Sequence, residues 1–237
     1  MGSVYQLTLR QLSGRWRLLI MTVLAAMPVL ITYLSVMDDD AGSVKDFEVA
    51  ILSTVLAGSI APLVVLAIAA AAFANELEDR TLANLVLAPM PRWKIALPKL
   101  LGSITVAAPF IALSALATSY VAFMGDARAM IAVTAGAIAG VALYASAFTW
   151  LGLVTTQAIG VGLLYIVLWE GFFSGFVSGV RLFSIRHYTT ALMHAIDERR
   201  FADMQHLTPT AAVVVALVIF GGFLFLAIRR LRRMDIP

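Results

Sequence analysis

Long stretches without any charged residue dominate this chain and limit the folds that it can adopt. They cover residues 18–37, 49–75, 100–125, 129–169 and 207–228. Each could form a helix that crosses the apolar core of a bilayer, which takes about 20 residues. Hydrophobic residues make up 61% of the 237 residues and charged residues only 13%. A soluble protein of this size cannot bury so much apolar surface, so the sequence predicts an all-α, polytopic membrane protein.

The longest stretch has to fold back on itself. Only Glu170 separates residues 129–169 from a further uncharged run at 171–180. As one helix these residues would measure roughly 78 Å, whereas the apolar core of a bilayer is about 30 Å thick. We place the turn at the Thr-Thr-Gln sequence of residues 155–157. The chain then forms one transmembrane domain with six spans, predicted at about 18–37, 50–74, 99–124, 130–153, 158–178 and 208–228.

The distribution of charge predicts the orientation of these spans. Six spans place both termini on one side of the membrane, and Lys and Arg accumulate on the cytoplasmic side. Eleven Lys and Arg residues fall on the side of the termini and six on the opposite side, where the acidic run 38–40 also lies. Both termini are therefore predicted to be cytoplasmic.

Two segments outside the spans also have helical patterns. Residues 3–17 alternate apolar and basic positions, which is typical of an amphipathic helix on the cytoplasmic surface. Residues 181–207 are too highly charged to span the membrane, yet Ile185, Tyr188 and Ile196 recur at helical spacing. This second segment predicts a helix on the outer side, before the last span.

The loop between the second and third predicted spans holds the most informative motif. Asn75 can cap a helix, with Glu78 three residues later as its capping-box partner. Pro89 ends the helix because it disfavours helical geometry in the residue before it, and Pro98 opens the third span. The sequence thus predicts a short amphipathic helix over 76–88. Such a helix either docks into a groove on a cytoplasmic partner or is an ordinary interfacial connector.

The order of residues in this loop, 75–98, resembles the corresponding loop of type 2 ABC (ABC-2) exporter permeases. An acidic residue, a Thr-Leu pair, a Leu-rich turn, a Pro, an Arg and a Lys follow one another. The matching residues are Glu76 or Glu78, Thr81, Leu82, Leu85, Pro89, Arg92 and Lys99. Arg80 stands where that family usually has Gly. The layout of surface helix, six spans and outer helical segment is similar as well. The resemblance implies that these residues, Arg80 included, couple the spans to an ATPase.

The resemblance also implies the partners. The chain lacks the Gly-x-x-x-x-Gly-Lys-Ser/Thr loop that would hold the phosphates of ATP, so it is expected to be no enzyme and to hold no cofactor. A separate ABC ATPase in two copies would bind ATP and Mg²⁺, with a second permease copy, most simply as a homodimer. In the plasma (inner) membrane of a prokaryote, the complex would export a substrate. The alternative is a permease that transmits force to an outer partner without moving a solute. Nucleic acid is not an expected partner, because the net charge is only +3.

A ridge of glycines marks the end of the fifth predicted span. Gly171, Gly175 and Gly179 are spaced by four residues, and Gly136 and Gly140 repeat this spacing in the fourth span. Small residues allow helix backbones to approach closely inside a membrane. The ridge predicts either a dimer seam or packing within one subunit.

Glu170 is the one ionisable residue deep in the apolar sequence. A carboxylate at the bilayer centre costs at least ~2.5 kcal/mol, so such residues are functional candidates. In the other interpretation the helix tilts, and Glu170 reaches the outer interface near Arg181.

The sequence offers little for hydrolytic or metal chemistry. Cysteine is absent, and the spacing of His187, His194 and His206 matches no standard metal site, so no metal is predicted. Ser174 or Ser178 with His187 could form an intramembrane Ser/His hydrolase, but neither Gly-x-Ser-x-Gly nor His-Glu-x-x-His occurs. The hydrolase is kept only as an alternative.

Overall fold

The structure is a computed structural model and describes residues 2–37, 50–78, 91–173, 184–199, 201 and 208–233. Within these residues all regular structure is helical. The α-helices are α1 (Gly2–Leu12), α2 (Arg15–Met37), α4 (Ala61–Ala69), α5 (Ala71–Glu78), α7 (Trp93–Phe123), α8 (Ala127–Val154), α9 (Ala158–Tyr165), α11 (Ile185–Ile196) and α12 (Pro209–Arg232). Two π-helical segments, η1 (Ile51–Ile60) and η2 (Ile166–Phe173), precede α4 and follow α9.

The described residues contain five helices that are long and apolar enough to cross a membrane. They are Arg15–Met37, Ile51–Glu78, Trp93–Phe123, Ala127–Val154 and Pro209–Arg233. A shorter apolar helix covers Ala158–Phe172, where the fifth span is predicted, and residues 174–178 of that span lie outside the described residues. The predicted turn at 155–157 lies between the end of α8 and the start of α9. The chain is thus a multi-pass, all-helical membrane protein.

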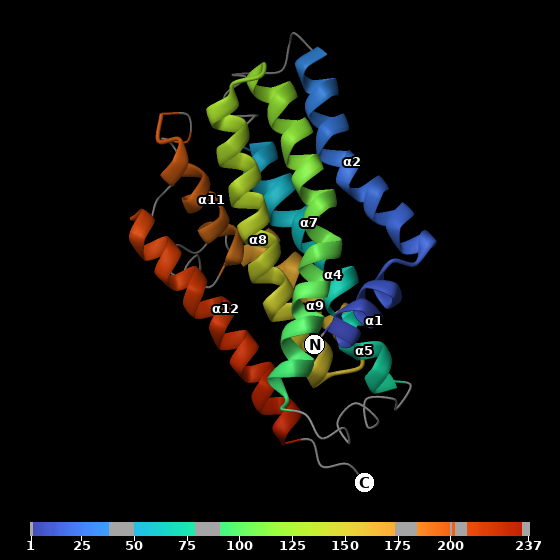
Figure 1. Cartoon of the computed structure of the whole chain (residues 1–237). Coiled ribbons are helices and arrows are strands. Elements are labelled where there is room, and N and C mark those ends of the chain that lie inside the picture. The colour runs from blue at the N-terminus through green and yellow to red at the C-terminus, as the bar shows by residue number, and fades with distance from the viewer. Residues whose placement is uncertain are drawn as a thin grey trace.

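The helices run alternately up and down the bundle (Figure 1). We call the end that carries α1, the end of α5 and the start of α7 the basal end. The end where α2 stops and α8 starts is the distal end. Four Arg residues at or next to the end of α12 also lie at the basal end: Arg229, Arg230, Arg232 and Arg233.

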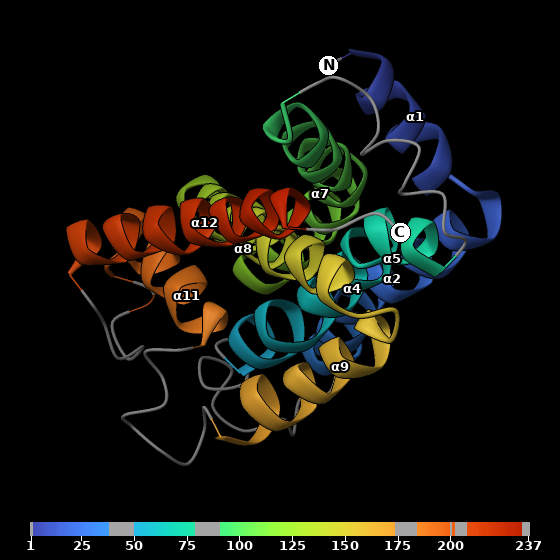
Figure 2. The same cartoon turned by 90° about the horizontal axis from the view of Figure 1, so that it is seen from below.

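Helix α8 lies at the centre of the bundle and packs against α7, α11, α12 and α4. In the end-on view, α12 and α9 lie on different sides of it (Figure 2). The share of buried residues distinguishes spans inside the bundle from spans at its periphery. In the most apolar stretch of Ile51–Glu78, 78% of the residues are buried, against 11% in Pro209–Arg233. The spans at the periphery therefore present apolar side chains to the surroundings, as expected for contact with lipid or another membrane subunit.

The N-terminal surface helix is shorter than the predicted 3–17. Helix α1 buries Val4, Thr8 and Leu12 on one stripe and packs against α7, where the Tyr5 hydroxyl donates a 3.0 Å hydrogen bond to Thr105 Oγ1. At its end the Ser13 N–H and hydroxyl both donate to the Leu9 carbonyl, at 3.0 Å and 2.7 Å, and Gly14 then separates α1 from α2. Arg15 and Arg17 belong to α2 instead.

Two predicted helix boundaries next to the 75–98 loop are wrong. Helix α5 runs without a break through Asn75 to Glu78, so Asn75 is not the first cap of a new helix. Helix α7 begins at Trp93, so Pro98 lies inside the third span and does not open it. In both places the helix extends further toward the basal end than predicted, and Ile95 and Ala96 in the added part of α7 are buried in one apolar cluster with Phe73 of α5.

Candidate functional site

The residues predicted to couple the spans to a partner fall into two groups. Glu76 and Glu78 close α5, while Arg92 caps α7 and Lys99 lies in its second turn. The other five lie outside the described residues: Arg80, Thr81, Leu82, Leu85 and Pro89. The described part of the predicted site is therefore the pair of helix ends from which segment 79–90 extends.

A buried ion pair joins these two helix ends. Lys99 Nζ lies 2.5 Å from Glu76 Oε1, and Lys99 is only 1% exposed. The pairing connects the last turn of α5 to α7 across the loop. Because a lone buried charge is costly, each residue makes the burial of the other tolerable. The pair thus links the end of α5 to the second turn of α7.

The ammonium group of Lys99 has further partners on the same helix surface. Nζ donates a hydrogen bond to the backbone carbonyl of Ala72 and lies 4.5 Å from the ring centroid of Phe73. A cation over an aromatic face is attracted by the ring quadrupole. Lys99 thus contacts α5 through a carboxylate, a carbonyl and a ring. The second carboxylate oxygen of Glu76, Oε2, is buried without a hydrogen-bond partner among the described residues.

This arrangement fixes the base of segment 79–90. One anchor is the end of α5, which continues from η1 and α4, and the other is the start of α7, a helix of 31 residues. Glu78, by contrast, is exposed to solvent. A force applied to the segment would therefore reach two long helices that are joined at their ends.

Glu170, a second buried glutamate among the described residues, lies in a cage of hydroxyl and amide donors. The hydroxyls of Tyr144 and Tyr165 each donate to Oε1 at 3.0 Å. The Ser184 hydroxyl donates to Oε2 at 2.5 Å, and the backbone N–H of Ile185 donates to Oε1 at 2.9 Å. Glu170 is fully buried. It is enclosed by the bundle and the start of α11, its depth in the membrane stays a prediction, and Arg181 lies outside the described residues.

The cage attaches the predicted outer helix to the bundle. Ser184 is the N-cap residue of α11 and Ile185 its first residue, so the Glu170 carboxylate lies at the positive end of the helix dipole. At the opposite end of α11, Arg128 Nε donates a 3.0 Å hydrogen bond to the carbonyl of Ile196. A carboxylate at the N-terminus and a guanidinium at the C-terminus both favour this position of α11.

Among the described residues, the weaker of the two predicted glycine motifs packs against another helix. Gly171 is exposed, and Gly175 and Gly179 lie outside the described residues. Gly136 and Gly140 instead face α11. A Cβ at Gly136 would lie 2.5 Å from Met193 Cγ, and one at Gly140 would lie 2.8 Å from Thr189 Oγ1. This weaker glycine pair therefore packs within one subunit.

Sequence reasoning missed three other glycines at helix contacts. A Cβ at Gly102 would lie 2.8 Å from Thr8 Cγ2 of α1, and one at Gly152 would lie 2.4 Å from the Ala70 carbonyl oxygen. A Cβ at Gly162 would lie 2.2 Å from Leu66 Cδ1. Isolated glycines carry no spacing signal, so only the fold reveals these contacts.

The residues considered for metal or hydrolytic chemistry have other surroundings. A ring nitrogen of His194 lies 3.1 Å from the Phe201 carbonyl oxygen, and the His187 ring packs edge-on against Tyr188. His206, Ser174 and Ser178 lie outside the described residues. Across the described ranges, His and acidic residues form no cluster that could hold a metal ion.

A comparison of the sequence with models of protein families identifies the family of this chain. Residues 5–169 match the model of the ABC-2 family transporter protein, which is more than half of the 237 residues. The chain belongs to the ABC-2 transporter family. The matched region extends from α1 to Glu170's neighbour Trp169, so it includes both helices that the Glu76–Lys99 pair joins. Among curated proteins, none matches the chain.

Membership of the ABC-2 family confirms the resemblance drawn from the 75–98 loop and the layout of the spans. Glu170, α11 and α12 lie outside the matched residues, whereas Tyr144 and Tyr165 of the cage lie within them. The family assignment thus concerns the basal ion pair directly and α11 through its contacts with matched elements such as α8 and η1.

Proposed function

We propose that this ABC-2 family chain is the permease subunit of an ABC transporter and is driven by a separate ATPase at its basal end. The main support is the family match over residues 5–169, which includes the joined ends of α5 and α7. The sequence itself has no phosphate-binding loop of the P-loop type. A transporter of this kind therefore needs its nucleotide-binding chain as a partner, and ATP and Mg²⁺ bind there.

The proposed mechanism follows from the geometry of the two helix ends. The ATPase contacts segment 79–90 and moves when it closes on ATP. Because Lys99 holds Glu76, this movement reaches α5 and α7 together. Helix α7 crosses the bundle to the distal end, and α5 continues into α4 and η1. The two spans thus move as one body, while loose helix ends would absorb the same displacement.

The proposed orientation places the basal end in the cytoplasm. Positive residues concentrate there, in the last turn of α12 and at the starts of α2 and α7. Such a bias sets the orientation of short-looped membrane proteins. In the plasma (inner) membrane of a prokaryote, two copies of the chain would pair above two ATPases and export a substrate through the space between them.

The test compares two substitutions near the basal end, made in the permease co-expressed with candidate ABC ATPases from the same genome. Leu85→Asp replaces an apolar anchor of the 76–88 segment, and Glu78→Ala removes an exposed charge. A leucine buried in a partner groove contributes roughly 1.5–3 kcal/mol, and an exposed charge pair under about 1. We expect Leu85→Asp to abolish co-purification of the ATPase or to uncouple its hydrolysis, while Glu78→Ala retains both.

Membrane insertion serves as the control, because Glu78 is the exposed last residue of the span Ile51–Glu78 and Leu85 comes after it in the chain. Both variants should reach the membrane in parental amounts. An ATPase that co-purifies with Leu85→Asp and supports parental transport would contradict the proposed coupling role. Hydrolase activity of this chain alone, without any ATPase, would contradict the proposal as a whole.

A further inference from the structure

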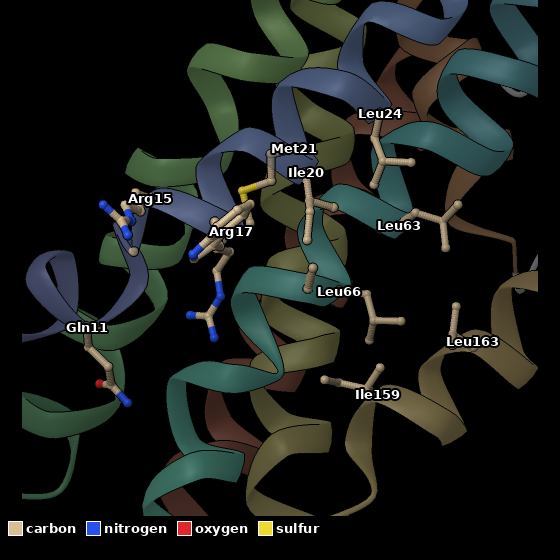
Figure 3. A pocket seen from close by; sticks show the side chains of 13 residues that line it. Gln11, Arg15, Arg17, Ile20, Met21, Leu24, Leu63, Leu66, Ile159 and Leu163 are labelled. Atoms are coloured by element: carbon tan, nitrogen blue, oxygen red, sulfur yellow. The ribbon is translucent and has the colours of Figure 1, made fainter.

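A cavity of about 670 Å³ opens between α2, α4 and α9. Helix α4 contacts both α2 and α9, and its side chains lie between those of the other two helices. Figure 3 shows Leu66 of α4 between Ile20 of α2 and Ile159 of α9. This volume falls in the range of small-molecule sites, about 300–1,000 Å³. The deep part of the cavity is lined by aliphatic side chains.

The basal side of the same cavity is positively charged. Arg15 and Arg17 line it, and the Arg15 guanidinium lies 6.0 Å from the ring centroid of Trp16. Arg17 Nη1 is buried and has no hydrogen-bond partner among the described residues. Of the 13 residues that line the cavity, none is acidic. As far as the described residues show, the lining of the cavity therefore provides guanidinium groups but no carboxylate, and one guanidinium has a buried donor without an acceptor.

The position of these groups along α2 indicates the depth of the cavity in the membrane. Arg15, Trp16 and Arg17 form the first turn of the first candidate span. Arg and Trp at the ends of spans lie at the level of the lipid headgroups. From Arg15 to Leu24, the lining extends about 14 Å along the helix toward the bilayer centre. The cavity is thus cationic at headgroup level and apolar below it.

We propose that this cavity binds an anionic phospholipid from the leaflet at the basal end. Its phosphate accepts a hydrogen bond from Arg17 and is attracted by Arg15, and one acyl chain lies between α2 and α9. Basic pockets between membrane helices are suited to anionic headgroups. A zwitterionic lipid would bring an ammonium group into a cavity that has no carboxylate to pair with it. The charge of the lining therefore selects for anionic lipid.

The test measures lipid retention by native mass spectrometry of the full chain, purified in a mild detergent and stripped of lipid. Palmitoyl-oleoyl phosphatidylglycerol and the phosphatidylcholine with the same chains are titrated separately, with inorganic phosphate as a third ligand. We expect selective retention of phosphatidylglycerol. Arg17→Gln should weaken this retention by about tenfold, the usual value of one charged hydrogen bond. Arg232→Gln removes an exposed charge at the same end, outside the cavity, and should change nothing.

A second variant tests the apolar part of the cavity without changing its charge. Ile159→Trp fills the space beside α9, where Ile159 is half exposed, and should reduce retention of phosphatidylglycerol while phosphate binding persists. If a variant does not fold, the parent still provides the test, because phosphatidylglycerol should raise its melting temperature more than phosphatidylcholine or phosphate does.

Three results would overturn the proposal. Equal retention of the two lipids would remove the charge selectivity, and parental retention by Arg17→Gln would remove the role of the guanidinium. Loss of dimer in Arg17→Gln and Ile159→Trp, with lipid retention unchanged, would assign the cavity to a contact with a second copy of the chain.

Discussion

Two glutamates are buried within the described part of this bundle, and they are stabilised in different ways. Glu76, which is 8% exposed, pairs with a cation, Lys99, on a neighbouring helix. Glu170, which is fully buried, accepts hydrogen bonds from three hydroxyls and from the first N–H of α11. One site relies on a single opposite charge, and the other on several neutral donors and a helix dipole. The two sites should therefore respond differently to substitution.

The difference also separates two mechanical roles. The basal pair connects two spans beside the segment where the ATPase is proposed to act, so its energy depends on the separation of α5 and α7. The cage around Glu170 connects α8, α9, η2 and α11 through donors on separate elements. The basal pair makes two span ends move together, whereas the carboxylate of Glu170, held from several elements, fixes the position of the helix that it caps.

The largest effect is expected from breaking the ion pair on one side. Lys99→Met leaves the Glu76 carboxylate buried without its cation, and this should lower the free energy of unfolding by about 3–5 kcal/mol. The double variant Glu76→Met with Lys99→Met removes both charges and should recover most of the loss, since apolar replacements of buried pairs are often neutral. Unfolding in mixed micelles measures both. Equal losses in the single and double variants would mean that the pair is not energetically coupled.

A smaller effect, of about 2–3 kcal/mol, is expected from Glu170→Gln. The amide keeps one acceptor oxygen but turns an NH₂ group toward hydroxyl and backbone donors, and the negative charge at the start of α11 is lost. Hydrogen exchange should therefore accelerate in α11 and stay unchanged in α7. Ser184→Ala removes one donor only and serves as the milder control. Unchanged protection of α11 in Glu170→Gln would show that the cage does not hold the helix.

The sequence predicted the course of the spans better than their ends. Uncharged runs predict membrane crossings because charged residues are costly in lipid, and this places the spans and the turn at 155–157. The ends depend on partners that are distant in the chain. Glu76 and Lys99 pair although 22 residues separate them, and no hydropathy pattern contains that contact. Asn75 was therefore predicted as a cap, although it lies inside α5.

The two buried glutamates likewise show which parts of the site could not be predicted from the sequence. Sequence alone identified Glu170 as unusual, since it interrupts an apolar run, and the family motif identified Glu76 and Lys99. Neither argument predicted that Tyr144 and Ser184 would meet at Glu170, because they belong to different elements of the chain. The spacing of the glycines also does not say which of them pack against another helix. In the structure Gly136 and Gly140 face α11, while Gly171 is exposed.

The smallest effect is expected at the C-terminal end of α11. There the charge of Arg128 interacts with the negative end of the helix dipole, as the charge of Glu170 interacts with the positive end. Arg128 is exposed, and its Nε bonds the carbonyl of Ile196, so Arg128→Ala removes one hydrogen bond and one favourable charge at the helix C-terminus. Such a charge contributes about 0.3–1 kcal/mol at an exposed position. Hydrogen exchange should accelerate only in the last turn of α11, while the turn next to Glu170 stays protected. Arg128→Lys keeps the charge without the guanidinium and should retain part of the protection. If Arg128→Ala destabilises α11 as much as Glu170→Gln does, burial of the carboxylate is not what distinguishes the two ends, and the dipole alone accounts for both.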